Sequence, residues 1–312
     1  MSDSHADSWP PLEYAAWSDT CNTLHMWLQI VGKIPLMQCA WVNHSWHVAL
    51  QVTARGLATR LLPHGDTSFQ VEFDFVAHQL HIRVVDGAEV SIPLEPQTTA
   101  QFYRKVMDAL DTLGVPVTIH TTPCELPNPI PFDRDEVHRA YDREYANRYW
   151  RVLVRAQRVF ATFRARFVGK NSPVHFFWGS ADLAVTRFSG RRAPPHPGGV
   201  PHLPHWVAQE AYSHEVSSAG FWAGGEAYPH AVFYSYAYPD PPGFAQAPVS
   251  PAAAYYDTTL KEFVLPYEKM RTAADPDGAL LDFLQSTYEA AATLGAWDRD
   301  ALESPCVPSA AA

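Results

Sequence analysis

The strongest constraint on the fold is an order of elements that occurs on both sides of a Pro-rich stretch, TTPCELPNPIPFD (121–133). Before this stretch, the hydrophobic pattern predicts a helix over 15–31, several strands, and a helix that ends in TLG (112–114). After it, the pattern predicts a helix over 136–167, several strands, and a second helix that ends in TLG (293–295). A repeated order of this kind indicates an internal duplication.

We therefore predict an α+β fold of two tandem related halves, each a mostly antiparallel sheet with helices on one face, arranged as a pseudo-twofold duplication. The first half is expected over 10–120 and the second over 134–302, joined by the Pro-rich linker 121–133. The remaining residues, 1–9 and 303–312, are expected to be flexible tails. Two unrelated antiparallel modules with similar strings are the alternative to a duplication.

The strands of the first half show a regular alternation of apolar and polar residues. Phe69, Val71, Phe73 and Phe75 alternate with polar residues, and the same period continues over 80–84. This pattern predicts a hairpin with one wet face. Cross-strand neighbours interact, so on that face we expect a salt-bridged surface formed by Glu72, Asp74, His81 and Arg83.

The second half contains an aromatic run, HFFWGSADLAVTRF (175–188), that is apolar on both predicted faces. A strand with two apolar faces is covered on both sides, so His175 and Asp182 are expected to be buried. The run is followed by a long loop, 189–230, with six prolines, six glycines and five of the 15 histidines. Long ordered loops often act as lids or binding loops, so we expect this one to cover a pocket.

The strongest candidate site combines the aromatic strand with the end of this loop. Its members would supply an acid, a base and an anion clamp among aromatic walls. The predicted catalytic residues are His175, Asp182, Arg187, His214 and Glu215. The predicted ligand-binding residues are Phe177, Trp178, Trp222 and Tyr234. The alternative is that the histidines are core residues and that Asp182 pairs with Arg187 or Arg191.

A transition metal is a second candidate for the chemistry of this site. His202 and His205 have HxxH spacing, as do His44 and His47, although this spacing alone is a weak pattern. The predicted ligands of a metal are His175, His214, Glu215 and His44. No HExxH, GxSxG, GxGxxG or Walker motif is present, so no motif identifies a reaction.

Composition excludes some partners. The formal net charge of −10 argues against nucleic acid, which favours a basic face. No apolar run reaches the length of a membrane span, and the N-terminus lacks the pattern of a signal peptide. The four scattered cysteines show no metal or disulfide spacing. We therefore expect a cytoplasmic protein with a small-molecule ligand, and the sequence does not define its oligomeric state.

Long strings of the chain resemble a bacterial family catalogued only as a domain of unknown function. These strings are VNHSWHVALQVTARGL, SPVHFFWGSADLAVTRFSGRRAPPHPGG, EAYSHEVSSAGFW and LQSTYEAAATLGAWD. The resemblance covers residues 9–303 and implies a stand-alone soluble protein of this length. It brings no assigned reaction and no known ligand residues.

Two functions of different classes follow from these observations. The first is a small-molecule enzyme that uses acid–base or metal-assisted chemistry in an aromatic-lined pocket. The second is a non-catalytic protein that binds a hydrophobic or aromatic small ligand, with the same polar groups placing it.

Overall fold

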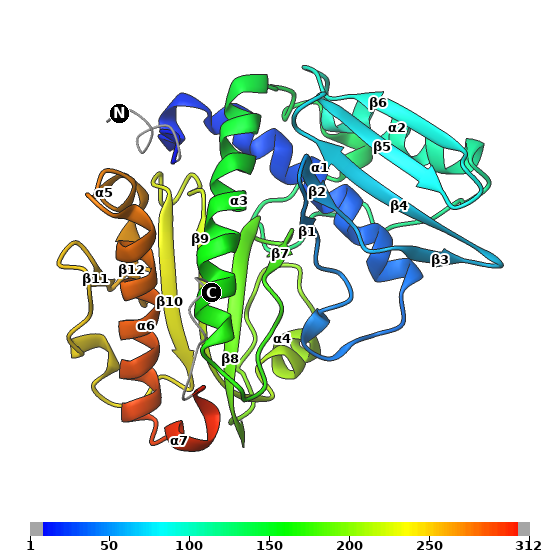
Figure 1. Cartoon of the computed structure of the whole chain (residues 1–312). Helices are drawn as coiled ribbons and strands as arrows, with labels where there is room; N and C mark the ends of the chain where they lie inside the picture. The colour runs from blue at the N-terminus through cyan, green and yellow to red at the C-terminus, as the bar shows by residue number, and fades with distance from the viewer. Residues whose placement is uncertain (1–8, 305–312) are drawn as a thin grey trace, which may run out of the picture.

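The computed structural model describes residues 9–304 and contains two antiparallel sheets with helices packed against them (Figure 1). This confirms the predicted α+β class. The longer helices are α1 (Ser18–Gln38), α2 (Thr99–Thr112), α3 (Arg143–Ala165) and α6 (Pro276–Leu294). No helix within 9–304 is long and apolar enough to cross a membrane.

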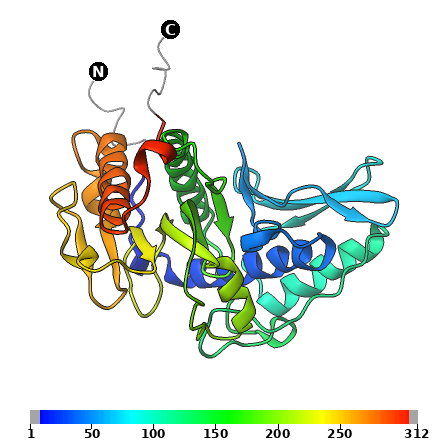
Figure 2. The ribbon, with the colours of Figure 1, turned by 90° about the horizontal axis from the view of Figure 1, so that it is seen from below.

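The first sheet contains the strands of the N-terminal half. Its order is β1-β2-β4-β5-β6, and β3 pairs with β4 outside this path. The strands are β1 (Gln51–Val52), β2 (Gly56–Ala58), β3 (Leu62–His64), β4 (Thr67–Asp74), β5 (Gln79–Val84) and β6 (Glu89–Pro93). Helices α1 and α2 cover one face of this sheet (Figure 2), where Trp27 of α1 and Phe73 of β4 both stack on Phe102 of α2.

The other face of the first sheet is the predicted salt-bridged surface, and the hairpin β4–β5 is confirmed. Arg83 Nη1 donates to Glu72 Oε2 at 2.7 Å, and Arg55 Nε donates to Asp74 Oδ2 at 2.5 Å. His81 lies 3.8 Å from the same Asp74 oxygen. The alternating sequence therefore places its charged residues on one face, and opposite charges meet there.

The second sheet has the order β11-β12-β10-β9-β8-β7. Its strands are β7 (His175–Phe177), β8 (Asp182–Arg192), β9 (His214–Trp222), β10 (Val232–Tyr238), β11 (Tyr255–Asp257) and β12 (Glu262–Pro266). Helices α3 and α6 lie across one face of it, in front of β8, β9 and β10 in Figure 1. Helix α3 packs through an apolar stripe, since Tyr149, Leu153, Ala156, Phe160 and Phe163 are all buried.

The two sheets meet edge to edge at the aromatic strand. Leu50, just before β1, exchanges two backbone hydrogen bonds with Phe176 of β7, with N–O distances of 2.9 and 3.0 Å. The side chain of Trp178 then packs against α1, because Gly32 has no Cβ to block it. Segments from both predicted halves therefore lie together next to β7.

The predicted single strand over 174–188 is a hairpin instead. Residues Trp178–Ala181 form a turn between β7 and β8, and Ala181 has a left-handed φ of 56°. An alanine in the left-handed region is unusual, which is why the apolar run reads as one strand. The turn places Phe177 opposite Asp182 on the same face of the sheet.

The predicted loop 189–230 is also shorter than expected. Strand β8 continues to Arg192, and the whole of β9 lies within the predicted loop. What remains between the two strands is residues 193–213, which we call the α4 connection because it contains α4 (His205–Ala211). A second loop, 223–231, joins β9 to β10.

Short helical segments complete the chain. They are η1 (Tyr14–Ala16), η2 (Asn43–Ser45), η3 (Phe132–Arg134), η4 (Phe244–Gln246), α5 (Tyr267–Arg271) and α7 (Arg299–Leu302). The division at the linker 121–133 stays a prediction, as does the duplication, since the two sheets differ in strand order. Of the predicted tails, 1–8 and 305–312 lie outside the described residues, whereas Trp9 is buried and Glu303 bonds Arg299.

Candidate functional site

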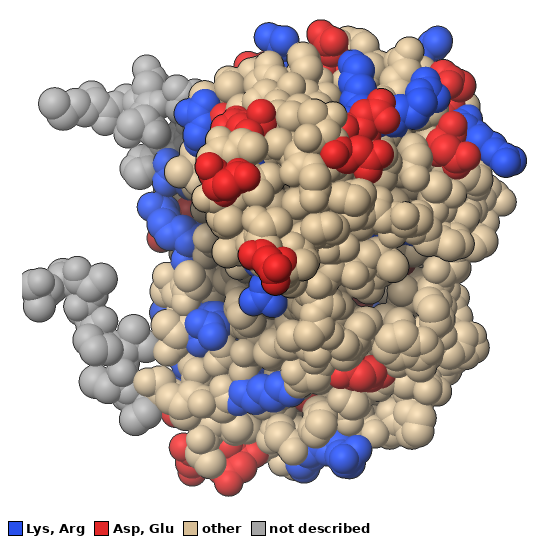
Figure 3. Space-filling model, turned by 90° about the vertical axis from the view of Figure 1, so that its right-hand side faces the viewer, with Lys and Arg blue, Asp and Glu red and all other residues tan. Residues whose placement is uncertain are grey.

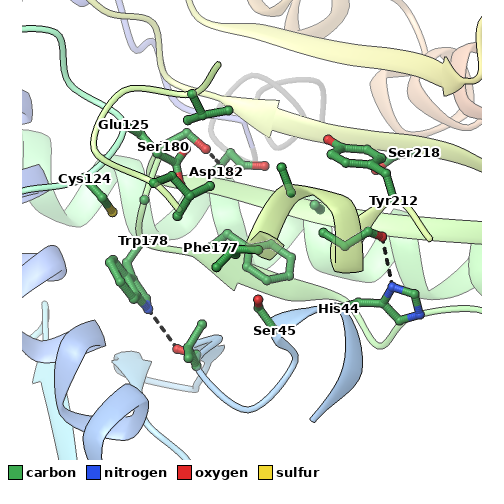
Figure 4. Close-up of a pocket in the computed structure, with 18 of the residues that line it drawn as sticks. His44, Ser45, Cys124, Glu125, Phe177, Trp178, Ser180, Asp182, Tyr212 and Ser218 are labelled. Atoms are coloured by element: carbon green, nitrogen blue, oxygen red, sulfur yellow. Dashed lines mark hydrogen bonds between the residues drawn. The ribbon is translucent and has the colours of Figure 1, made fainter. Parts of the chain in front are cut away.

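A cavity of about 870 Å³ lies between the face of the second sheet not covered by α3 and α6 and the α4 connection. Segments 41–48 and 120–125 of the chain close its other sides. Figure 4 shows Glu125, Ser180 and Asp182 at one end of this space, and His44, Tyr212 and Ser218 at the other. The α4 connection thus covers a pocket at the junction of the two sheets, as expected for the long loop.

The walls between these two ends are largely apolar. Phe177, Trp178, Trp222 and Tyr234, the four predicted ligand-binding residues, all line the cavity. The α4 connection adds apolar side chains on the opposite side, namely Val200, Leu203, Trp206, Val207 and Ala208. Trp206 packs on Trp41 with ring centroids 4.8 Å apart, and both rings are about half exposed.

Charge on the molecular surface is unevenly distributed on one side of the protein. In Figure 3 the Lys, Arg, Asp and Glu side chains stand mainly along the upper and lower parts of the view and leave a broad area between them without charge. Exposed apolar side chains near the cavity include Leu36 and Trp41, both of which also line it.

Three carboxyl groups from distant segments line the cavity, and we call Glu125, Asp182 and Glu262 the carboxyl cluster. Glu125 belongs to the Pro-rich stretch, Asp182 begins β8 and Glu262 begins β12. Asp182 accepts hydrogen bonds from two hydroxyls: Tyr234 donates to Oδ2, and Ser180 donates to Oδ1 at 2.8 Å. Glu262 accepts no hydrogen bond from any described residue.

Burial raises the pKa of all three carboxyls. For Glu125 it is raised to about 7, first by desolvation and then by the charge of Asp182. For Glu262 it is also raised to about 7, by desolvation and by the charges of Asp182 and Asp257. The pKa of Asp182 is raised by desolvation, against the opposing effect of its bonds from Tyr234 and Ser180. Like charges and low dielectric both favour the protonated form of a carboxyl.

Helix α1 holds the backbone that carries this cluster. The Gln29 side chain donates to the carbonyl oxygens of Cys124 and Gly179 and accepts from the Cys124 amide at 2.9 Å. His25 Nε2 lies 2.7 Å from the same Gly179 oxygen. One buried amide therefore links the segment of Glu125 to the turn before Asp182.

Two glycines leave the space that the cluster occupies. A Cβ on Gly179 would overlap the Glu125 carboxyl, and a Cβ on Gly220 of β9 would overlap the Tyr234 hydroxyl. At Gly220 the Cβ would also meet the backbone carbonyl of Leu183, so glycine is required there, whereas at Gly179 a side chain would displace the Glu125 carboxyl. The geometry around Asp182 therefore depends on both positions.

The opposite end of the cavity carries hydroxyls and one imidazole. Tyr212 and Tyr236 share a hydrogen bond of 2.8 Å, and Thr186 and Ser218 share another of 2.8 Å. His44 Nδ1 donates to the Ala211 carbonyl at 2.9 Å, so its Nε2 accepts from Lys170 Nζ at 2.6 Å. Burial lowers the pKa of His44, which keeps this ring neutral.

Of the five predicted catalytic residues, Asp182 lines the cavity and two histidines lie near it. His175 is buried beside Trp46, with ring centroids 6.0 Å apart, and its Nδ1 has no partner among the described residues. Desolvation lowers its pKa to about 4. His214 lies at the far end, 6.4 Å from His44 between ring centroids. The structure therefore does not bring His175 and His214 together.

Arg187 and Glu215 do not share a face with Asp182, which corrects the predicted grouping. Side chains alternate along a strand, and Arg187 points to the helix side, where it donates to the Phe163 carbonyl. Its guanidinium lies 3.5 Å from the centroid of the Phe163 ring. Glu215 pairs with Arg191 at 2.6 Å. The alternative pairing of Asp182 with Arg187 or Arg191 is likewise wrong.

The predicted metal ligands do not converge. Within residues 9–304, no group of three or more His, Cys, Asp or Glu side chains is arranged to hold a metal ion. His44 is already bonded through both ring nitrogens, and Glu215 faces the other side of the sheet from Asp182. Of the HxxH pair, His202 lines the cavity and His205 begins α4.

Sequence reasoning missed Glu125 and Glu262. Glu125 follows Cys124 in a Pro-rich stretch that reads as a linker, so no local pattern marks it as part of a site. Glu262 is the only acidic residue in the segment KEFVLPY. It lines the cavity because β12 pairs with β10, which the sequence does not indicate. Both are brought to Asp182 only by tertiary structure.

Comparison with known proteins gives one result. A model of a family of unknown function, DUF5996, matches residues 9–304, which is nearly the full chain and agrees with the resemblance found in the sequence. No curated protein and no solved structure matches. The chain therefore belongs to the family of unknown function DUF5996.

Proposed function

We propose that this protein binds a small, largely apolar molecule in the cavity between the second sheet and the α4 connection. The observation that carries this proposal is the cavity itself, whose volume of about 870 Å³ is lined largely by aromatic and aliphatic side chains. Small-molecule sites are typically concave, of roughly 300–1,000 Å³, and apolar with a few placed polar groups. The cavity has this character.

The polar groups are concentrated at the two ends. Glu125 and Asp182 occupy one end, and the hydroxyls of Tyr212 and Ser218 occupy the other. Glu262 also lines the cavity, on β12 next to β10. An elongated ligand would place its apolar body along Phe177 and Trp222 and its polar atoms at the ends. Polar groups at fixed positions orient a ligand, while the apolar wall supplies most of the affinity.

Binding of a neutral fluorescent dye, N-phenyl-1-naphthylamine, tests this proposal. We expect saturable binding with one site per chain and a rise in emission, because the dye leaves water for an apolar wall. Ala184 is buried and lines the cavity, so Ala184→Trp fills it and abolishes binding. Ala208→Trp on α4 blocks it independently from the other side.

The matched control places the same ring outside the cavity. Ser91→Trp lies on the wet face of β6 and is expected to leave dye binding unchanged. Circular dichroism checks that each variant is folded. Absence of dye binding to the wild type, or equal binding by a folded Ala184→Trp variant, contradicts the proposal.

An enzyme that uses acid–base chemistry is the second candidate. The hydrogen bond between Asp182 and Tyr234 favours it. Asp182 accepts from Tyr234 inside the cavity, and two further carboxyls titrate near neutral pH, where an acid or base is most effective. In this function Asp182 is the base and Glu125 or Glu262 is the acid. The aromatic wall then places the substrate.

Turnover of compounds that bind the cavity separates the two candidates. Each compound that displaces the dye is incubated with wild type and with Asp182→Asn, and products are followed by mass spectrometry. An enzyme gives product with the wild type and at least about 100-fold less with the variant. Binding without any product favours the non-catalytic function.

A further inference from the structure

The carboxyl cluster has no Lys or Arg partner within residues 9–304. None of the ion pairs among the described residues involves Glu125, Asp182 or Glu262. Among the described residues that line the cavity, Lys33 is the only Lys or Arg. Its ammonium donates to the carbonyls of His120 at 3.0 Å and Thr122 at 2.5 Å, so it is already bonded.

Asp182 is buried, and Glu125 and Glu262 are half-buried. Carboxyls withdrawn from water without a counter-ion are costly, and proteins usually pair them. Here Asp182 accepts from the hydroxyls of Tyr234 and Ser180, and the Ser180 hydroxyl also lies near Glu125. Glu262 lines the cavity and accepts no hydrogen bond from any described residue. Its oxygens are therefore available to a group that enters the cavity.

Aromatic rings line the cavity beside these carboxyls. Tyr234 and Tyr236 of β10 stack with ring centroids 6.1 Å apart, and Trp222 of β9 lines the same wall. Positively charged nitrogen is attracted to the faces of Trp and Tyr rings. Aromatic walls beside carboxylates are therefore suited to a cation that also has an apolar body.

We propose that the ligand of this cavity carries a positively charged nitrogen that binds at Glu125, Asp182 and Glu262, with its apolar body along the aromatic wall. This inference rests on the proposed function, because it assigns the ligand class of the same cavity. The chemical class is an apolar amine. An ammonium has three N–H donors and no acceptor, which matches a set of carboxylate oxygens.

A matched set of probes tests the charge of the ligand. Phenylbutylamine, phenylbutanol and phenylbutyrate share one apolar body and differ in the charge of the terminal group. Each is used to displace N-phenyl-1-naphthylamine from the wild-type protein at neutral pH. We expect the amine to bind at least about tenfold more tightly than the alcohol, since a charge-assisted hydrogen bond contributes about 1.5–3 kcal/mol. The carboxylate is expected to bind most weakly.

The ratio of amine to alcohol affinity is then measured in a Glu125→Gln/Glu262→Gln double variant. The ratio is the readout because it is insensitive to changes in the apolar wall. We expect it to fall to about one to threefold, since the carboxamides carry no charge. The control is Glu72→Gln on the first sheet, whose ratio is expected to equal that of the wild type.

The pH dependence of the wild type tests the inference where the double variant does not fold. The carboxyls are protonated below their raised pKa, so the ratio is expected to increase several-fold between about pH 6 and about pH 8. A ratio near one in the wild type at about pH 8, with the dye still bound, overturns this inference and leaves the proposed function standing. Absence of dye binding overturns the proposed function itself.

Discussion

The outer face of the first sheet and the cavity face of the second sheet both carry carboxyl side chains, in opposite settings. On the first sheet Asp74 accepts from Arg55, and Glu72 accepts from Arg83. At the cavity face of the second sheet, Asp182 accepts from the hydroxyls of Tyr234 and Ser180, and among the described residues neither Glu125 nor Glu262 forms an ion pair with Lys or Arg. Both faces belong to antiparallel sheets. They differ in whether Lys or Arg balances the negative charge of the carboxylates.

The pKa values follow this difference. The pKa of Asp74 is lowered, because Arg55 and the Val76 and Ala77 amides outweigh desolvation. The pKa of Glu125 is raised to about 7, because desolvation and Asp182 act on it without a cation. A paired carboxyl contributes to stability, whereas an unpaired one lowers stability and remains available to a ligand. The comparison therefore predicts opposite effects when single carboxyls are neutralised.

The largest effect is expected for Asp74→Asn. This change removes the ion pair with Arg55 and weakens the bonds that Asp74 Oδ1 accepts from the Val76 and Ala77 amides, at 2.8 and 2.7 Å. We expect the free energy of unfolding at neutral pH to fall by about 3 kcal/mol, measured by urea denaturation. Because the folded pKa is lowered, the loss is present above pH about 4 and shrinks as the carboxyl of the wild type protonates. Asp108→Asn, exposed on α2, is the control, and an equal effect there contradicts this account.

The second-largest effect is expected to be an increase in the free energy of unfolding. At about pH 8 the Glu125 carboxyl is ionised in a half-buried site, and Glu125→Gln removes that cost, so we expect the free energy of unfolding to rise by about 2 kcal/mol. Because the folded pKa is raised, the carboxyl adds stability below its unfolded pKa and loses it as the pH passes through about 7. The advantage of the variant is therefore expected to vanish near pH 4. An unchanged or lower stability at about pH 8, against the exposed control Glu95→Gln, argues that Glu125 has a cationic partner.

A smaller loss is expected for Tyr234→Phe. The variant keeps the ring on the cavity wall and removes only the hydroxyl that donates to Asp182. We expect a loss of about 1–2 kcal/mol in the free energy of unfolding at about pH 8, and less at acid pH where Asp182 is protonated. Tyr255→Phe, an exposed tyrosine of β11, provides the matched control.

The smallest effect is expected for Glu72→Gln. Its partner Arg83 is 39% exposed, and exposed ion pairs contribute little because water competes for both groups. A loss of about 0.5 kcal/mol, decreasing with salt, is expected in the same denaturation experiment. If the free energy of unfolding falls as much as for Asp74→Asn, the difference in burial between Glu72 and Asp74 does not explain their contributions to stability.

The regular first sheet was more predictable from sequence than the site. The alternation around Glu72 and Asp74 indicates both the hairpin and its charged face, because strand periodicity alone defines them. The cavity needs segments far apart in sequence, such as Glu125 and Glu262, and no local pattern links them. Arg187 illustrates the same limit of sequence-based prediction. The turn before β8 decides which residues of that strand face the helices, and Arg187 faces them.

The four predicted ligand-binding residues, Phe177, Trp178, Trp222 and Tyr234, each line the cavity. Aromatic residues in adjoining strands indicate a buried apolar wall, but they do not define the ligand. Binding of a ligand by these residues stays a prediction.

Calorimetric titration of the wild type with phenylbutylamine, in two buffers of different ionisation enthalpy at about pH 7, tests the central claim most directly. If the carboxyl cluster is unpaired and partly protonated in the free protein, the bound cation ionises it. The account then predicts 1:1 binding with net release of up to about one proton per ligand, and none with phenylbutanol. Binding of the amine with no proton release, or proton release that persists in the Glu125→Gln/Glu262→Gln variant, contradicts it.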